Sequence, residues 1–133
     1  MESSFSNRHV SFDLRSDGTP VYRPSYVVWE ITLRCDQACR FCGSRAGFAR
    51  DDELTTVEIV DAIAQLAKMG VKEIALHGGE AYLRDDFLTI VKAIRDQGMD
   101  PTMVTGGRGL TAKLAREAAA AGIRSVSLSI DGL

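Results

Sequence analysis

The sequence predicts an α/β protein in which parallel strands alternate with helices. Short runs rich in β-branched and aromatic residues, the composition of strands, alternate with segments whose apolar residues recur at helical spacing. A glycine follows each predicted helix, as is common where a helix ends in a left-handed residue. The segments between successive strands have the length that right-handed crossovers need, so we expect the strands to run parallel.

The predicted elements follow one another as β(αβ)3. The first strand covers residues 26–32, and the first helix begins with a capping box of Thr55 and Glu58 and ends before Gly70. The next elements are strand 72–77, helix 85–97, strand 101–105, helix 111–121 and strand 124–130. We assign residues 25–133 to one core, the N-terminal half of a (β/α) barrel, because a full TIM barrel takes ~250 residues. We expect this partial TIM barrel to be truncated after its fourth strand.

Residues 1–24 are predicted to form a separate N-terminal arm. Residues 1–8 have the polar composition of a mobile tail, without the apolar stretch of a secretory signal. Asp17-Gly18 lies between two short alternating runs, which indicates a hairpin turn. An irregular arm is the alternative.

The bulk composition excludes several classes of function. The 133 residues are 45% hydrophobic and 26% charged, which is typical of a soluble globular protein. A formal net charge of -2 provides no basic field for nucleic acid, and no apolar run approaches the ~20 residues that cross a bilayer. We therefore expect a cytoplasmic protein that binds neither nucleic acid nor a membrane.

The most informative motif is a cluster of three cysteines directly after the first strand. Cys35, Cys39 and Cys42 have the spacing C-x3-C-x2-C, and they are the only cysteines in the chain. In parallel α/β folds, sites form at the carboxyl ends of the strands. Three thiolates on one loop suit three corners of an iron–sulfur cubane and leave one iron open. The alternatives are a zinc site with His77 as fourth ligand, and a conventional electron-transfer cluster with a fourth cysteine from elsewhere.

The segment WEITLRCDQACRFCGSRAG, residues 29–47, resembles the cluster loop of the radical SAM superfamily. The resemblance covers roughly residues 25–133 and implies a full or partial (β/α) barrel. It implies a [4Fe–4S] cluster whose open iron is chelated by S-adenosylmethionine. One electron then breaks the S–C5′ bond, and the resulting 5′-deoxyadenosyl radical abstracts a hydrogen atom from the substrate. By the same resemblance, Phe41 occupies the aromatic position near the adenine.

A second motif, Gly78-Gly79-Glu80, ends the second core strand. Glycines allow close backbone approach, and a carboxylate can accept hydrogen bonds from an ammonium group. The resemblance implies that this motif binds the amino group of the methionine moiety. The family often has proline next, where this chain has Ala81. His77 either faces the active site or only ends the strand.

Weaker candidates follow the later strands. Thr105-Gly106-Gly107 is similar to the Thr-Asn-Gly of related enzymes, but it lacks the asparagine. Ser129-Ile130-Asp131 is similar to a Ser-x-Asp motif of peptide-modifying members. By alternation, Ser129 and Asp131 share one face of the strand, and if that face points into the barrel, Ser129 meets the cofactor ribose or carboxylate. Asp131 is a turn or supporting residue in this interpretation.

Charged residues flank the cysteine loop. A buried glutamate needs a partner, so we expect Glu30 either to face the barrel lumen or to pair with an arginine. Arg34, Arg40 and Arg45 are solvated charges, or they help to dock an electron donor or hold the cofactor carboxylate.

These observations leave two hypotheses. The first is a radical SAM enzyme of the SPASM/twitch type that matures a peptide or a cofactor precursor, with flavodoxin or ferredoxin as reductant. The second is a non-catalytic iron–sulfur or zinc-binding module.

Overall fold

The computed structural model describes residues 10–131, and residues 1–9, which include the predicted tail, lie outside it. The elements, in chain order, are β1 (Val10–Leu14), β2 (Pro20–Pro24), β3 (Tyr26–Thr32), α1 (Thr56–Met69), β4 (Glu73–Gly78), the short 3₁₀ helix η1 (Ala81–Leu83), α2 (Phe87–Asp96), β5 (Asp100–Thr105), α3 (Ala112–Ala121) and β6 (Ser125–Leu128).

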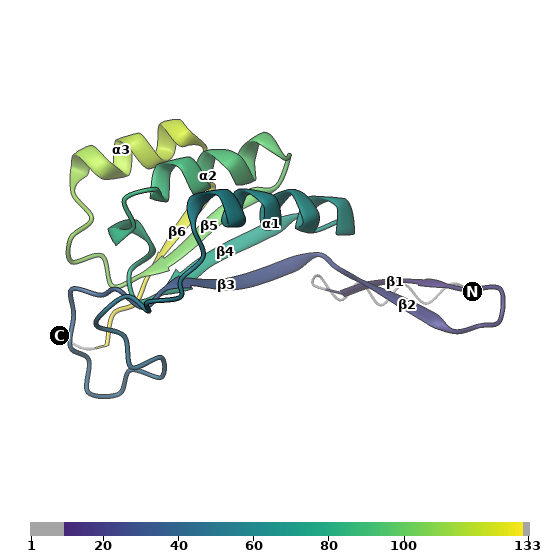
Figure 1. Cartoon of the computed structure of the whole chain (residues 1–133), viewed down its shortest axis with the longest axis horizontal. Coiled ribbons are helices and arrows are strands. Elements are labelled where there is room, and N and C mark those ends of the chain that lie inside the picture. Colours follow the sequence, from purple (N-terminus) through teal and green to yellow (C-terminus); the bar gives the residue numbers. More distant parts are fainter. Residues whose placement is uncertain (1–9, 132–133) are drawn as a thin grey trace.

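A four-stranded parallel sheet in the order β3-β4-β5-β6 forms the core. The predicted α/β class with parallel strands is therefore confirmed. Figure 1 shows α1, α2 and α3 together on one face of this sheet. The register between β3 and β4 shifts between Glu30 and Thr32, so the pairing is irregular just before the cysteine loop.

The hydrophobic core lies between the sheet and the helices. Ile74 and Leu76 of β4 and Met103 of β5 are almost fully buried against Phe87 and Ile90 of α2. Burying a side chain of this size stabilises the fold by roughly 1.5–3 kcal/mol. This layer fixes the carboxyl ends of the strands relative to one another.

Capping residues set the bounds of two of the three helices as expected. The Thr55 side chain accepts from the Glu58 N–H and the Glu58 carboxylate accepts from the Thr55 N–H, which is the predicted capping box. Gly70 and Gly122 end α1 and α3 with φ of 96° and 105°. Helix α2 begins at Phe87, two residues later than predicted.

An antiparallel hairpin of β1 and β2 precedes the sheet, with its turn at Asp17-Gly18. Gly18 has φ of 81°, a conformation that favours glycine. Figure 1 shows the hairpin extending beyond the amino end of β3, away from the edge where the cysteine loop lies. The described part of the chain contains no helix long and apolar enough to cross a membrane.

Candidate functional site

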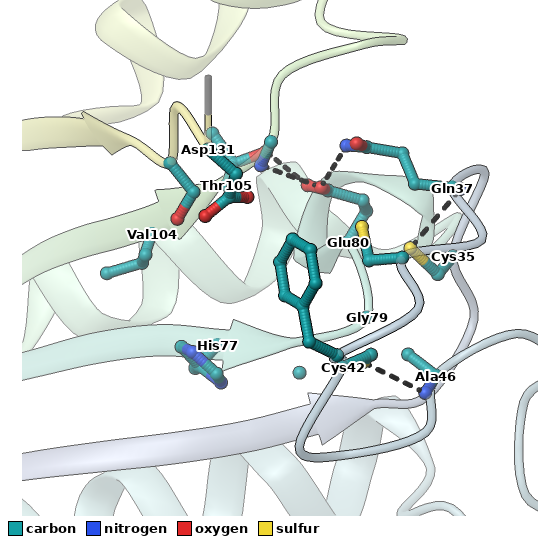
Figure 2. A pocket seen from close by; sticks show the side chains of 15 residues that line it. Cys35, Gln37, Cys42, Ala46, His77, Gly79, Glu80, Val104, Thr105 and Asp131 are labelled. Atoms are coloured by element: carbon teal, nitrogen blue, oxygen red, sulfur yellow. Dashed lines mark hydrogen bonds between the residues drawn. The ribbon is translucent and has the colours of Figure 1, made fainter.

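A cavity of about 250 Å³ opens at the carboxyl ends of the strands. All eight residues predicted from the sequence line it: Cys35, Cys39, Phe41, Cys42, Gly78, Gly79, Glu80 and Ser129. Figure 2 shows that the cysteine loop forms one wall of the cavity and the ends of β4 and β5 form the other. The fold therefore brings together motifs that are far apart in the sequence.

The cysteine loop is closed at its base by backbone hydrogen bonds. The Gly47 N–H donates to the Leu33 carbonyl at 2.8 Å, and the Cys35 N–H donates to the Gly47 carbonyl at 3.0 Å. Within the loop, backbone N–H groups of Gln37 and Ala46 lie 3.4 Å from the sulfurs of Cys35 and Cys42. Such donors favour thiolates, the form of cysteine that binds metal.

The three cysteine sulfurs do not all lie within 4.8 Å of one another. A tetrahedral zinc ion with Zn–S bonds of ≈ 2.3 Å would bring its thiolates to about 3.8 Å from one another. Among residues 10–131, the one group of three possible ligand atoms all within 4.8 Å of one another is Cys35, Asp36 and Glu80, so the three cysteines do not meet this condition. In this structure the three sulfurs are therefore not gathered as ligands of one ion.

The surroundings of Cys35 shift the pKa of its thiol. Burial raises the pKa of its thiol, the Gln37 N–H lowers it, and the nearby carboxylates of Glu80 and Asp36 raise it again. The net shift is upward and favours the protonated thiol. A metal at this position supplies the positive charge that would offset it, because metal binding and loss of the thiol proton are coupled.

Gly78 and Gly79 allow two stretches of backbone to touch. A Cβ at Gly78 would lie 2.1 Å from the Thr32 carbonyl oxygen, and one at Gly79 would lie 2.2 Å from that of Arg34. The Gly79 and Glu80 N–H groups donate to the same two carbonyls at 2.9 and 2.7 Å. The glycines therefore let the end of β4 dock on the start of the cysteine loop. The sequence alone predicts only a close approach of this backbone to a ligand.

Glu80 carries a buried carboxylate, with the residue 3% exposed, in the wall of the cavity. Its Oε1 accepts from the Gln37 side-chain amide at 3.1 Å and from the Gly106 N–H at 2.8 Å. Its Oε2 accepts from the Thr105 hydroxyl. These donors hold the carboxylate across the end of β5 and the cysteine loop (Figure 2).

The side-chain contacts that Gln37 and Thr105 make with Glu80 are not predicted from the sequence. The position of Gln37 between Cys35 and Cys39 is the one signal in the sequence that could have indicated its role in the site. Thr105 is predicted only as the first residue of the Thr105-Gly106-Gly107 motif, with no role for its side chain.

The remaining predicted residues occupy the outer part of the cavity. Phe41 is 71% exposed at its mouth. Ser129 is exposed, and its N–H donates to the Thr105 carbonyl at 2.9 Å, which continues the pairing past β6. His77 and Asp131 also line the cavity.

Glu30 lies outside the cavity and has an arginine partner, one of the two alternatives considered. Ser44 donates to its carboxylate at 2.7 Å, and Arg50 also binds it. These hydrogen bonds lower the pKa of Glu30. Arg34 donates to the Leu83 carbonyl at 3.2 Å, so this arginine holds the base of the loop.

The loop that follows β5 closes the site on that side. The Tyr82 hydroxyl donates to Asp36 at 3.2 Å and accepts from the Gly109 N–H at 2.8 Å. Burial, together with the Glu80 and Asp36 carboxylates, raises the pKa of Tyr82 to about 12, so it stays a neutral donor. Arg108 donates to the Asp36 carbonyl at 2.9 Å. The loop after β5 is thereby fastened to the cysteine loop.

Known proteins are similar in sequence to this chain. The chain is 33% identical over 111 residues to PqqA peptide cyclase of Rhizobium meliloti (strain 1021), covering 83% of this chain and 30% of that protein. It is 34% identical over 110 residues to AdoMet-dependent heme synthase of Methanosarcina barkeri (strain Fusaro / DSM 804), covering 82% and 32%. The chain thus spans about a third of the length of these relatives.

Solved structures share the fold. BtrN in complex with AdoMet and 2-DOIA superposes with a TM-score of 0.66 at 20% identity, covering 82% of this chain and 47% of that one. Streptococcus suis SuiB bound to precursor peptide SuiA gives 0.62 at 19% identity, covering 71% and 21%. The family model described as Radical SAM superfamily matches residues 29–133. The chain belongs to the radical SAM superfamily.

Proposed function

We propose that this protein uses a [4Fe–4S] cluster to cleave S-adenosylmethionine reductively and to abstract a hydrogen atom from a substrate. The observation that carries the proposal is the convergence of three thiols and one buried carboxylate on a single cavity. When bound, the cluster and S-adenosylmethionine supply the electron transfer and the hydrogen abstraction. The protein supplies binding, orientation and exclusion of water.

Each predicted residue has a role in this proposal. Cys35, Cys39 and Cys42 hold three irons of the cluster, and the fourth iron is left for the cofactor. Glu80 accepts from the ammonium group of the methionine moiety, a charge-assisted contact in a shielded position. The role of Glu80 is supported by its burial in the cavity wall.

Three further contacts complete the cofactor site that we propose. The backbone of Gly78 and Gly79 approaches the methionine moiety, Phe41 packs near the adenine, and Ser129 contacts the ribose or carboxylate. Their common support is that all four residues line the cavity that contains the thiols.

The substrate class is proposed from relatives. By its name, PqqA peptide cyclase acts on a peptide, and AdoMet-dependent heme synthase makes heme. We propose a peptide or cofactor precursor as substrate, in an enzyme of the SPASM/twitch type with residues 25–133 as its core and residues 1–24 as an arm. A flavodoxin or ferredoxin would supply the electron, and we place the protein in the cytoplasm because three free thiols on one loop suit a reducing compartment.

Anaerobic reconstitution tests the proposal. Wild-type protein should bind about four irons per chain, and with dithionite and S-adenosylmethionine it should release 5′-deoxyadenosine. The Cys39→Ala variant should lose both properties, while Ala38→Ser, the adjacent exposed position, should keep them. A colourless protein that binds one zinc ion, or a Cys39→Ala variant that keeps the full iron content, would contradict the proposal.

A further inference from the structure

We infer that Gln37 is a positioning residue for the Glu80 carboxylate, occupying space that Gly106 leaves free. The inference rests on the proposed function, in which Glu80 binds the ammonium group of S-adenosylmethionine. It assigns to Gln37 the task of holding that carboxylate in the orientation that the ammonium group meets.

The hydrogen bonds at Glu80 define this orientation. An ionised carboxylate offers about four lone-pair sites. Gln37 and the Gly106 N–H occupy Oε1, and the Thr105 hydroxyl occupies one site on Oε2. One lone-pair site on Oε2 remains free for a further hydrogen-bond donor. Removal of Gln37 would free a site on Oε1 and allow the carboxylate to turn.

Gly106 is what makes room for the Gln37 side chain. A Cβ at Gly106 would lie 1.9 Å from Gln37 Nε2 and 2.8 Å from its Cδ. These atoms form the far end of a flexible side chain, so an alanine at position 106 would displace the amide without disturbing the backbone. Gln37 and Gly106 therefore act as a pair, and a side chain at position 106 excludes the Gln37 contact.

Gln37 also connects the carboxylate to the cysteine loop. Its backbone N–H donates to Cys35 Sγ at 3.4 Å, while its side chain reaches Glu80 at 3.1 Å. Figure 2 shows the side chain extending from the loop across the cavity wall. The loop that holds the metal thereby sets the orientation of the carboxylate that receives the cofactor.

Two substitutions remove this contact by different routes. Gln37→Ala deletes the amide, and Gly106→Ala displaces it. Each should weaken equilibrium binding of S-adenosylmethionine to the reconstituted protein about tenfold, the scale of one hydrogen bond to a charged group. Because both changes break the same contact, the double variant should bind no more weakly than either single one.

A ligand comparison separates positioning from a general defect in the site. Binding is measured by anaerobic calorimetry before any reductant is added, with S-adenosylmethionine and with its analogue that lacks the amino group. The variants should lose affinity for the first and keep wild-type affinity for the second. The matched control is Gln65→Ala, which removes a similar amide–carboxylate bond, to Asp61 at 2.6 Å, on an exposed face of α1. This control should bind both ligands as the wild type does.

The outcomes distinguish this inference from the proposed function. Wild-type affinity for S-adenosylmethionine in Gln37→Ala, an equal loss for both ligands, or additive losses in the double variant would overturn the inference and leave the proposed function standing. A wild-type protein that holds its cluster and does not bind S-adenosylmethionine would overturn both.

Discussion

Gly78 and Gly79 illustrate how a motif can serve the fold and the site at once. Their missing side chains allow the carbonyls of Thr32 and Arg34 to approach within hydrogen-bonding distance of the Gly79 and Glu80 N–H groups. That docking places Glu80 in the wall of the cavity. The glycines are therefore required before any ligand binds.

We predict that Gly79→Ala destabilises the metal-free protein by about 2 kcal/mol or more, because its Cβ would collide with backbone atoms that have no alternative position. Gly43→Ala is the control, since a Cβ there has no neighbour within 4 Å, and it should change stability by less than about 1 kcal/mol. Urea denaturation measures both. Equal effects at the two positions would contradict the steric argument.

The residues that sequence analysis identified lie in motifs whose chemistry is visible in one stretch of chain. Three cysteines in eight positions indicate a metal loop, and the rule that parallel strands share a carboxyl edge indicates that Glu80 lies near them. The Gln37–Glu80 contact joins positions 43 apart, and it depends on the absence of a side chain at Gly106. No local pattern encodes such a contact, because it arises only when two loops meet.

At the scale of elements, periodicity and capping residues predicted the three α-helices and the four strands of the parallel sheet, with bounds that differ by at most two residues. Helix α2 was expected to begin at Asp85 and begins at Phe87. Asp86 lies just outside the helix at its N-cap position, and its side chain makes no capping hydrogen bond. It accepts instead from Arg84 and from Thr56, which begins α1.

Arg84 joins β3 to the segments that precede α1 and α2, near the base of the cysteine loop. Its guanidinium donates to the carbonyls of Ile31 and Leu54 at 3.1 Å each, and it pairs with Glu53 and Asp86. The side chains of Arg84 and Glu53 are only 12% exposed, and that of Asp86 is 16% exposed. Removing one partner of this network therefore costs more than at a surface ion pair, because it leaves the other charge buried and unpaired.

This network makes stability dependent on pH. The hydrogen bond from Arg84 holds the pKa of Asp86 below its ordinary value of 3.8. A carboxyl group whose pKa is lower in the folded protein contributes its full stability above the unfolded pKa, and that contribution is lost as pH falls through the folded pKa. We predict that Asp86→Asn costs about 2 kcal/mol at neutral pH and that its deficit relative to wild type shrinks below pH of about 4.

Unfolding by urea at a series of pH values measures this dependence. Asp96→Asn is the control, because the Lys92–Asp96 pair on α2 is more than half exposed and should contribute little at any pH. A deficit for Asp86→Asn that stays constant down to pH 2 would show that the charge on Asp86 is not what stabilises the network.

At the scale of the whole molecule, the site depends on the sheet and not on the hairpin. The cavity takes residues from the cysteine loop after β3, from the ends of β4 and β5, and from the segment after β6. The hairpin lies at the other end of β3 (Figure 1). Its Phe12 and Tyr22 rings pair across the strands at 6.0 Å and are 56% and 66% exposed.

This separation predicts two levels of stability. Phe87 is 1% exposed between α2 and the sheet, so Phe87→Ala should cost about 3–5 kcal/mol and accelerate amide hydrogen exchange throughout β4 and β5. Phe12→Ala removes one exposed ring pair, worth about 0.5–1.5 kcal/mol, and should accelerate exchange only within β1 and β2. Exchange followed by mass spectrometry of peptides from each element measures both.

If Phe12→Ala also accelerated exchange in β4, the hairpin would contribute to the stability of the sheet, and its removal would disturb the cavity. If it did not, the arm is energetically independent of the site.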